Sequence, residues 1–392
     1  MSEPAEHGLR RRMHGEIAKL REAAQFRTLG NPPGINLYSN DYLGLARDSR
    51  LKKAALDAIE AAQSVGSTGS RLLSGNSPEW ERIEHDFAEF AGTEAALYFG
   101  SGYAANVGLI SSIAGRGDLM FSDALNHASL IDGIRLSGAA KIIYPHADMV
   151  FLRNALREHR DDPGAKVIVT ESIFSMEGDI APIERLVELA RDYNADVVVD
   201  EAHAIGVYGP QGRGVCAALG LERDILAVVH TCGKALASAG AFVCGSHLLR
   251  DYLVNHARTF IFSTAMPPYM AGQIRAALEL TRDADDARAH LRAIATELRT
   301  QLTAAGIDCG ASSTQIIPVR LGENEAALSV ASVLQEAGFA VRAIRPPTVP
   351  EGTSRIRFSL TASLSMDGIR RLAVATEAAI KTIQASATIA HA

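Results

Sequence analysis

The stretch Val197-Val198-Val199-Asp200-Glu201-Ala202-His203 decides the fold prediction for this chain. A run of β-branched residues ends in an acid, and an imidazole follows three positions after that acid. Such a run is typical of a strand that helices cover on both faces. In open α/β sheets ligands bind beyond the carboxyl ends of the strands, so Asp200 and His203 would face one crevice. The same residues are explained about equally well by an aspartate that caps a helix and a histidine whose ring is hydrogen-bonded within the protein.

Further short apolar segments alternate with helical patterns around this stretch. The strand candidates are Ala95–Phe99, Leu119–Ser122, Lys141–Tyr144, Lys166–Thr170, Asp196–Val199, Ile225–His230 and Gly240–Cys244. Strands that alternate with helices predict a mainly parallel sheet in an α/β fold. We expect this large domain to cover residues 49–275, after an amphipathic helix (Ala5–Arg27) and an arm within residues 1–48.

A smaller α+β domain is expected at the carboxyl end, over residues 276–392. A long helix, Pro267–Gly306, would connect it to the large domain. The elements expected after this helix are strands at Gln315–Leu321, Ala340–Ile344 and Ser354–Leu360, and a helix near Glu325–Ala337. A last helix would close the domain.

The composition excludes several classes of protein. A hydrophobic share of 47% with 21% charged residues is that of an ordinary globular protein. A net charge of −6, without basic runs interleaved with aromatics, argues against a nucleic-acid partner. We expect no membrane partner, because no apolar leader and no bilayer-long apolar run occur. Cys216, Cys232, Cys244 and Cys309 lack metal-site spacing, which fits free thiols in a reducing cytoplasm and no bound metal.

The segment Thr231-Cys232-Gly233-Lys234 follows another buried strand. Most lysines are solvated surface residues, and that is the default interpretation of a single one. The apolar flanks of Lys234 give little reason for surface exposure. A partly desolvated lysine loses its proton more readily and becomes a nucleophile toward carbonyl groups. The sequence therefore favours an aldehyde cofactor held by Lys234.

Such a cofactor needs partners for its ring. A carboxylate keeps a pyridine nitrogen protonated, which makes the ring an electron sink, and Asp200 suits that role. His203 could hydrogen-bond the phenolic oxygen, and His127, in Asn126-His127-Ala128-Ser129, could cover the face of the ring. By itself His127 is better explained as part of a helix start.

The segment from Gly100 to Asn106 follows a strand and opens a helix, which suits a phosphate. It also matches the dinucleotide fingerprint, with Asp118 and Asp123 near the distance expected for a ribose contact. A nicotinamide-dependent oxidoreductase is therefore an alternative. Two observations count against this alternative. Tyr103 is bulky at the place where the phosphates of a dinucleotide would approach, and a nicotinamide site would not explain Asp200, His203 and Lys234.

With these residues assembled, the chain resembles the α-oxoamine synthase family of fold-type I pyridoxal-phosphate enzymes. Seven ordered motifs carry the resemblance: Ser39–Leu45, Ser101–Asn106, Asn126–Leu130, Phe174–Asp179, Asp200–His203, Phe262–Pro268 and Leu360–Ala362. It implies a fold-type I transferase whose mainly parallel large domain precedes a smaller α+β domain.

The resemblance also implies roles for residues around the cofactor. Lys234 would form the Schiff base, Asp200 would pair with the pyridinium, His203 would bind the phenolic oxygen and His127 would stack. The residues implied around the cofactor and its phosphate are Gly102, Tyr103, Ser175 and Thr231. Family members are homodimers with shared sites, so Thr264 would reach the phosphate bound by the neighbouring subunit.

On the substrate side, Arg357 is implied to hold the carboxylate of the amino acid. Arg355 lies two positions away on the same strand, so the choice between the two rests on the family motif. The stretch Ile344–Thr353 is most similar to family members that condense L-alanine with a pimeloyl thioester, carried by a protein or by coenzyme A. Thr348 in this stretch would contact substrate. Arg27 is a weaker candidate for that task, and Asn40 is the remaining substrate-binding assignment. Members that use glycine or serine share the whole cofactor site and remain an alternative.

Overall fold

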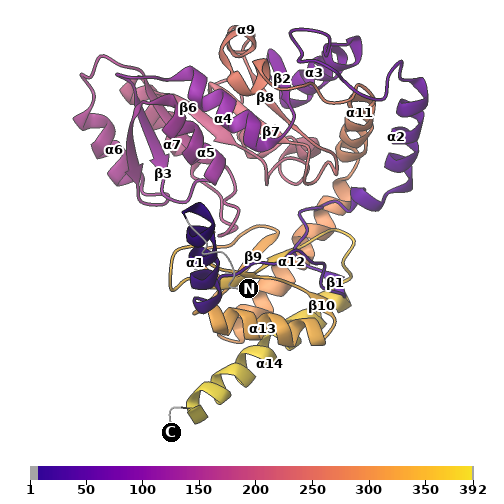
Figure 1. Cartoon of the computed structure of the whole chain (residues 1–392), viewed down its shortest axis with the longest axis vertical. Coiled ribbons are helices and arrows are strands. Elements are labelled where there is room, and N and C mark those ends of the chain that lie inside the picture. The colour runs from indigo at the N-terminus through magenta and orange to yellow at the C-terminus, as the bar shows by residue number, and fades with distance from the viewer. Residues whose placement is uncertain (1–7, 391–392) are drawn as a thin grey trace, which may run out of the picture.

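The structure, a computed structural model, describes residues 8–390, with side chains described for residues 8–385. Figure 1 shows a larger unit with a central sheet and a smaller unit that contains the carboxyl end. The helices are α1 (Leu9–Glu22), α2 (Ser49–Ala61), α3 (Pro78–Ala91), α4 (Gly102–Ile113), α5 (Ala128–Ser137), α6 (Met149–Glu158), α7 (Ile183–Tyr193), α8 (Val215–Ala218), α9 (His247–His256), α10 (Arg258–Ile261), α11 (Tyr269–Arg282), α12 (Asp285–Ala304), α13 (Asn324–Glu336) and α14 (Met366–Ala390). The strands are β1 (Ile35–Asn36), β2 (Ala95–Phe99), β3 (Leu119–Asp123), β4 (Ala140–Tyr144), β5 (Lys166–Glu171), β6 (Asp196–Asp200), β7 (Ala227–Thr231), β8 (Ala241–Gly245), β9 (Ile316–Gly322), β10 (Phe339–Ala340), β11 (Ala343–Ile344) and β12 (Ser354–Ser359).

The central sheet has seven strands in the order β2-β8-β7-β6-β5-β3-β4. The pairs from β7 through β6, β5 and β3 to β4 are parallel, and only β8 runs antiparallel to its two neighbours. The carboxyl ends of β3, β5, β6 and β7 therefore meet along one edge of the sheet. That edge carries the acid, the imidazole and the lysine of the sequence prediction.

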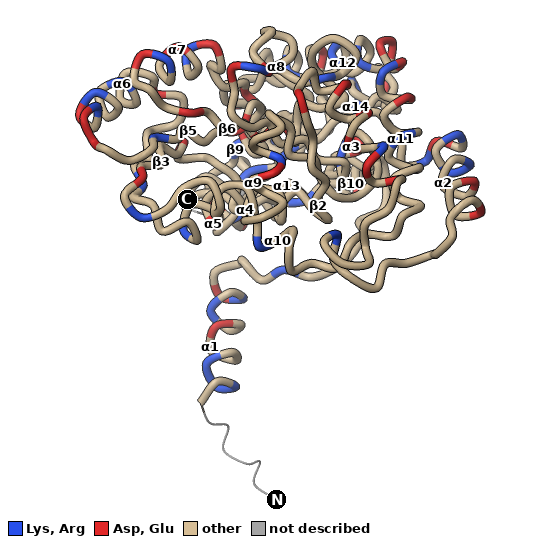
Figure 2. Tube along the Cα trace, turned by 90° about the horizontal axis from the view of Figure 1, so that it is seen from above, with Lys and Arg blue, Asp and Glu red and all other residues tan. Residues whose placement is uncertain are grey.

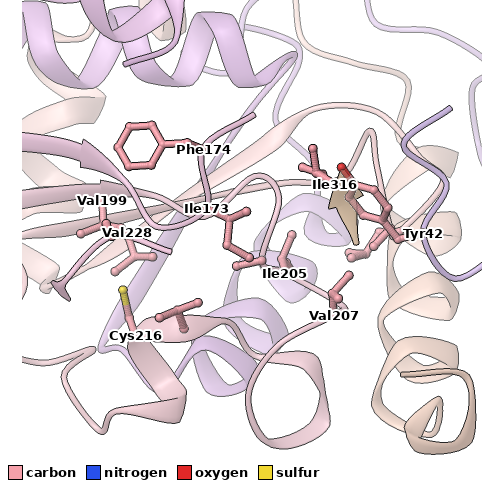
Figure 3. Packing of buried hydrophobic residues seen from close by; sticks show 14 of the residues in the cluster. Tyr42, Ile173, Phe174, Val199, Ile205, Val207, Cys216, Val228 and Ile316 are labelled. Carbon is pink, nitrogen blue, oxygen red and sulfur yellow. The ribbon is translucent and has the colours of Figure 1, made fainter. Parts of the chain in front are cut away.

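Two hydrophobic layers cover the sheet, as expected for strands whose residues are buried on both faces. Leu97 and Phe99 of β2 join a cluster with residues of α4, α5, α9 and α10. Ala96 and Tyr98, which point to the other face, join the larger cluster. This larger cluster continues from the sheet toward the small domain, where Figure 3 shows Ile205, Tyr42 and Ile316 of β9 near one another.

All seven strands expected in the large domain are confirmed, with ends that differ by no more than two residues. Two other expectations are wrong. The long helix expected over Pro267–Gly306 breaks between α11 and α12, because the buried guanidinium of Arg288 caps the end of α11 by donating to the carbonyls of Thr281 and Arg282. The single strand expected over Ala340–Ile344 is two strands, because β10 pairs with β1 whereas β11 pairs with β12.

The small unit holds the antiparallel sheet β11-β12-β9 with α12, α13 and α14. The division predicted at residue 275 falls within α11, which packs on α2 and α3 of the large unit, and stays a prediction. Residues 5–7 of the expected first helix lie outside the described residues. The helix α1 itself projects away from the rest of the protein in Figure 2. Between residues 8 and 390, no helix combines the length and the apolar character needed to cross a membrane.

Candidate active site

Lys234 lies three residues beyond β7, and its half-buried side chain reaches the carboxyl edge of the sheet. Its Nζ is 3.0 Å from Nε2 of His203. Burial lowers the pKa of Lys234 to about 8, although the carboxylates of Asp200 and Glu171 act in the opposite direction. A substantial share of this amine is therefore unprotonated near neutral pH, which is the form that attacks carbonyl groups.

Asp200 is the last residue of β6, and its carboxylate is buried. Oδ2 accepts a hydrogen bond from Nδ2 of Asn106 at 2.6 Å, and Oδ1 accepts one from the backbone N–H of Ala202 at 2.8 Å. These two donors fix the orientation of the carboxylate. Asn106 belongs to α4, so this helix supports the acid from the neighbouring layer.

His203 is buried between a tyrosine and the lysine. Its Nδ1 is 2.6 Å from the hydroxyl of Tyr42, and its Nε2 faces Lys234. Burial, together with the nearby cations Lys234 and Arg357, lowers the pKa of His203 well below its usual value. The imidazole is therefore neutral at physiological pH, and Tyr42 fixes the direction of its ring.

His127 is the N-cap of α5, so the interpretation as part of a helix start is correct. Its Nδ1 accepts a hydrogen bond from the backbone N–H of Ser129 and lies 2.8 Å from the Ser129 hydroxyl. These contacts leave the ring exposed on the wall of a cavity. Partial burial lowers the pKa of His127, the charge of Asp200 opposes this shift, and the charge of Lys234 adds to it. A neutral, fixed imidazole is suited to stacking on a planar ligand.

The amino end of α4 lies beside the end of β7. A Cβ added at Gly102 would lie 3.4 Å from Oγ1 of Thr231, so the two residues are in close proximity. Ser101 caps the helix by accepting a hydrogen bond from the backbone N–H of Ala104 at 3.0 Å. Unpaired backbone N–H groups at a helix start bind phosphate. Tyr103 in the same turn is half exposed, and its hydroxyl donates to Asp132 on α5.

A cavity of about 810 Å³ lies beside the segments that follow β3 and β5. Its wall brings together four residues that the sequence analysis selected from distant parts of the chain, namely Arg27, His127, Ser175 and Thr348. Nη2 of Arg27 donates to Oγ1 of Thr348 at 3.3 Å and to the carbonyl oxygen of Pro346 at 3.2 Å. A cation and a hydroxyl thus stand side by side at this wall.

The two arginines of β12 are in different electrostatic environments. Arg355 donates to the carboxylate of Glu177 at 2.6 Å, so its charge is neutralised. Arg357 instead donates to the amide oxygen of Asn40 from both Nη atoms, each at 3.2 Å, and its buried Nε has no hydrogen-bond partner among the described residues. Of the two guanidiniums, Arg357 is therefore the one able to bind an incoming carboxylate.

Thr264 is exposed and pairs with Ser70 through an isolated antiparallel bridge. Within the described part of the chain, none of its contacts reaches Lys234 or Asp200. Its position does not contradict a role in a neighbouring subunit.

Three residues of the site were not selected in the sequence: Tyr42 and Asn106 belong to motifs noted there, whereas Glu171 directly follows the strand expected over Lys166–Thr170. Tyr42 and Asn106 hold His203 and Asp200 directly. Glu171, at the end of β5, lies opposite Asp200 in the sheet, and its buried Oε1 has no partner in the described residues. Burial, followed by the charge of Asp200, raises the pKa of Glu171 to about 8. Its place at the end of a buried strand is the signal that could have identified it.

The donor set fits a planar aldehyde cofactor that carries a phosphate. A lysine of lowered pKa, a buried acid on the next strand and a glycine-rich helix start lie at one edge of the sheet. The buried Oδ1 of Asn106 also lacks a hydrogen-bond partner in the described chain, so this oxygen is available to accept a hydrogen bond from a ligand.

The comparisons with known proteins agree with this geometry. Residues 32–375 match the family described as aminotransferase class I and II. The chain is 44% identical over 381 residues to 8-amino-7-oxononanoate synthase from Geobacter sulfurreducens, with 93% of this chain and 97% of that protein covered.

Two solved structures are similar over almost the whole chain. A serine palmitoyltransferase with pyridoxal phosphate as an internal aldimine has a TM-score of 0.89 at 30% identity, covering 96% of this chain and 100% of the other. The 8-amino-7-oxononanoate synthase of Francisella tularensis has a TM-score of 0.78 at 28% identity, covering 90% and 99%. The chain therefore belongs to the aminotransferase class I and II family, as a fold-type I protein of its α-oxoamine synthase group.

Proposed function

We propose that this chain is an 8-amino-7-oxononanoate synthase that requires pyridoxal phosphate and serves biotin synthesis. It would condense L-alanine with a pimeloyl thioester and release carbon dioxide and free thiol. The observation that carries the proposal is the presence in one site of Lys234, whose pKa is lowered, and of Arg357, which no carboxylate among the described residues neutralises. Relatives of that name, similar over nearly the full length, support it.

The residues at the strand ends would hold the cofactor. Lys234 would bind it covalently, Asp200 would face the ring nitrogen, His203 would face the phenolic oxygen and His127 would cover one face. Gly102, Tyr103, Ser175 and Thr231 complete the set of cofactor-binding residues that we propose. Pyridoxal phosphate would supply an aldehyde that captures amines and a ring that accepts the electron pair from the α-carbon.

The residues of the chain would perform the remaining steps. Arg357, oriented by Asn40, would bind the α-carboxylate of alanine until that group leaves as carbon dioxide. Nζ of Lys234, unprotonated in part near neutral pH, would remove the proton from the α-carbon. The same amine would return a proton to that carbon after decarboxylation. Tyr42 would keep the His203 ring in place throughout.

The acyl donor would enter through the cavity in front of His127. The Arg27 guanidinium and the Thr348 hydroxyl at its wall offer a site for the distal carboxylate of a pimeloyl chain. Arg27 and Thr348 also border a second cavity of about 980 Å³, which is lined by Arg21, Arg342 and Arg345 and, within residues 8–390, by no acidic residue. Such a basic cavity suits the phosphates of a coenzyme A or carrier-protein arm.

The chain would act as a homodimer in the cytoplasm. Leu73 and Phe262, on the two segments joined by the bridge between Ser70 and Thr264, are 81% and 70% exposed. Exposed apolar side chains of this kind support a protein–protein contact, and in the proposed dimer Thr264 would lie near the phosphate site of the partner. The four cysteines are free, which is compatible with a reducing compartment.

A second candidate is a synthase that uses serine or glycine, because the serine palmitoyltransferase fold overlays with a high TM-score. Thiol release should be measured with alanine, glycine and serine against pimeloyl and acetyl thioesters. Fastest release with alanine and the pimeloyl thioester, together with 8-amino-7-oxononanoate identified by mass, is the expected result. Equal or faster release with serine would favour the second candidate. A colourless protein that binds nicotinamide dinucleotide would contradict both.

A further inference from the structure

Two arginines of the small domain face each other across the sheet and are bridged by a carboxylate from the large domain. Arg355 of β12 and Arg320 of β9 are direct register partners. Like charges in such a pair repel each other. Glu177, in the loop between β5 and α7, accepts a hydrogen bond from Arg355 on Oε1 and one from Arg320 on Oε2, each at 2.6 Å.

The Glu177 carboxylate is charged in this bridge. Burial alone raises its pKa, but the hydrogen bonds from Arg320 and Arg355 outweigh burial and keep the pKa below its usual value. Glu177 is 8% exposed and Arg355 is 2% exposed, so solvent screens their attraction weakly. The bridge is therefore charged at neutral pH.

The same loop is fixed to the small domain by its backbone. The carbonyl oxygen of Gly178 accepts hydrogen bonds from the backbone N–H of Ser313 at 3.0 Å and from the Thr314 hydroxyl at 2.8 Å. A Cβ at Gly178 would lie 2.0 Å from the carbonyl oxygen of Ile316, so only glycine permits this approach. The loop that carries Glu177 is thus held by Arg355 of β12 through an ion pair and by the segment that leads into β9, which pairs with β12, through its backbone.

This contact connects both halves of the substrate site. Ser175, on the cavity wall, lies two residues before Glu177, and Arg357 lies two residues after Arg355. Without Glu177, β12 would present a second unneutralised guanidinium two positions from Arg357. A small carboxylate could then bind at either cation, and only one of these positions places its α-carbon correctly.

We propose that Glu177 determines the specificity of the carboxylate site by neutralising Arg355 and by fixing β12, so that the amino-acid carboxylate binds Arg357 alone. The proposal rests on the function proposed above. Glu177 acts through Arg355 and is a positioning residue. A purely stabilising role is a weaker explanation, because buried ion pairs often contribute little net stability compared with apolar residues of similar size.

The test is a titration of the holoenzyme with L-alanine, followed by the visible absorbance of the bound cofactor. In Glu177→Gln we expect alanine affinity to fall by about tenfold to a hundredfold, since a misplaced substrate forfeits its oriented contacts. Cofactor affinity should change by less than about threefold, because the Glu177 side chain makes its hydrogen bonds to Arg320 and Arg355 and not to a proposed cofactor-binding residue. Acetate should inhibit the variant more strongly than the wild type, since the released arginines offer it a site.

Two further variants separate this role from general damage. Asp308→Asn removes an exposed carboxylate 3.8 Å from Arg320 but leaves Glu177 in place, and it should behave like the wild type. The double variant Glu177→Arg with Arg355→Glu again places one carboxylate beside two guanidiniums, and it should recover most of the alanine affinity. If Glu177→Gln does not fold, Glu177→Asp keeps the charge but cannot reach both arginines, and it should show a smaller loss of the same kind.

The outcomes are distinguishable. A folded Glu177→Gln or Glu177→Asp holoenzyme with wild-type alanine affinity and unchanged acetate inhibition would overturn the proposal. A wild-type holoenzyme that does not respond to alanine would overturn the proposed function instead, and with it this inference.

Discussion

The pKa of Lys234 gives the sharpest quantitative prediction, because it sets how fast the apoenzyme captures an aldehyde. A lysine in water has a pKa near 10.4, so about one amine in 2,500 is unprotonated at pH 7. Burial lowers the pKa of Lys234 to about 8, which makes roughly one in ten unprotonated at the same pH. The nucleophilic form is therefore enriched roughly 200-fold.

The assay follows capture of pyridoxal phosphate by the apoenzyme through visible absorbance, from pH 6 to pH 10. The capture rate should rise with pH and level off above a midpoint near 8, because the pKa is lowered and the unprotonated amine accumulates as pH passes it. Arg357 contributes to the lowered pKa, so Arg357→Gln should move the midpoint to higher pH. A wild-type midpoint near 10, or a midpoint that falls in Arg357→Gln, would refute the reasoning.

Three further predictions concern substrate binding and stability. Arg357→Ala should weaken alanine binding by about a hundredfold with little change in cofactor affinity, measured by titration of the absorbance; equal losses of both would contradict the assignment. Gly178→Ala should cost about 3 kcal/mol or more of unfolding free energy in urea, because its φ is +71° and its Cβ would meet Ile316; a cost below about 1 kcal/mol would be inconsistent with the loop contact. Arg342→Gln should raise KM roughly tenfold for the coenzyme A thioester but not for a phosphate-free N-acetylcysteamine thioester; equal changes would argue against phosphate binding in the basic cavity.

The sequence predicts those parts of the site that depend on where a buried strand ends. Asp200 and Lys234 each follow an apolar run, and parallel strands bring such ends to one edge regardless of the loops between them. The catalytic assignments made for them remain predictions until they are measured. Their spatial arrangement is what the fold now supplies.

Features that depend on contacts between distant segments could not be predicted from local patterns. The difference between Arg355 and Arg357 arises from Glu177, which lies 178 residues before Arg355 in the sequence. The break between α11 and α12 has a similar origin, because Arg288 folds back onto the carbonyl oxygens of the preceding helix. No glycine or proline marks that break in the sequence.

The placement of Gly102 and Asn106 on one helix has a consequence for how the protein can evolve. The two residues are four positions apart, so α4 separates them by about 6 Å along its axis and keeps them near one side. The helix thus fixes the distance between the turn proposed to bind phosphate and the Asn106 amide that hydrogen-bonds Asp200. One residue inserted between them would rotate Asn106 by about 100° and detach the acid from its support. We expect the protein to tolerate substitutions between Gly102 and Asn106 far better than insertions or deletions there.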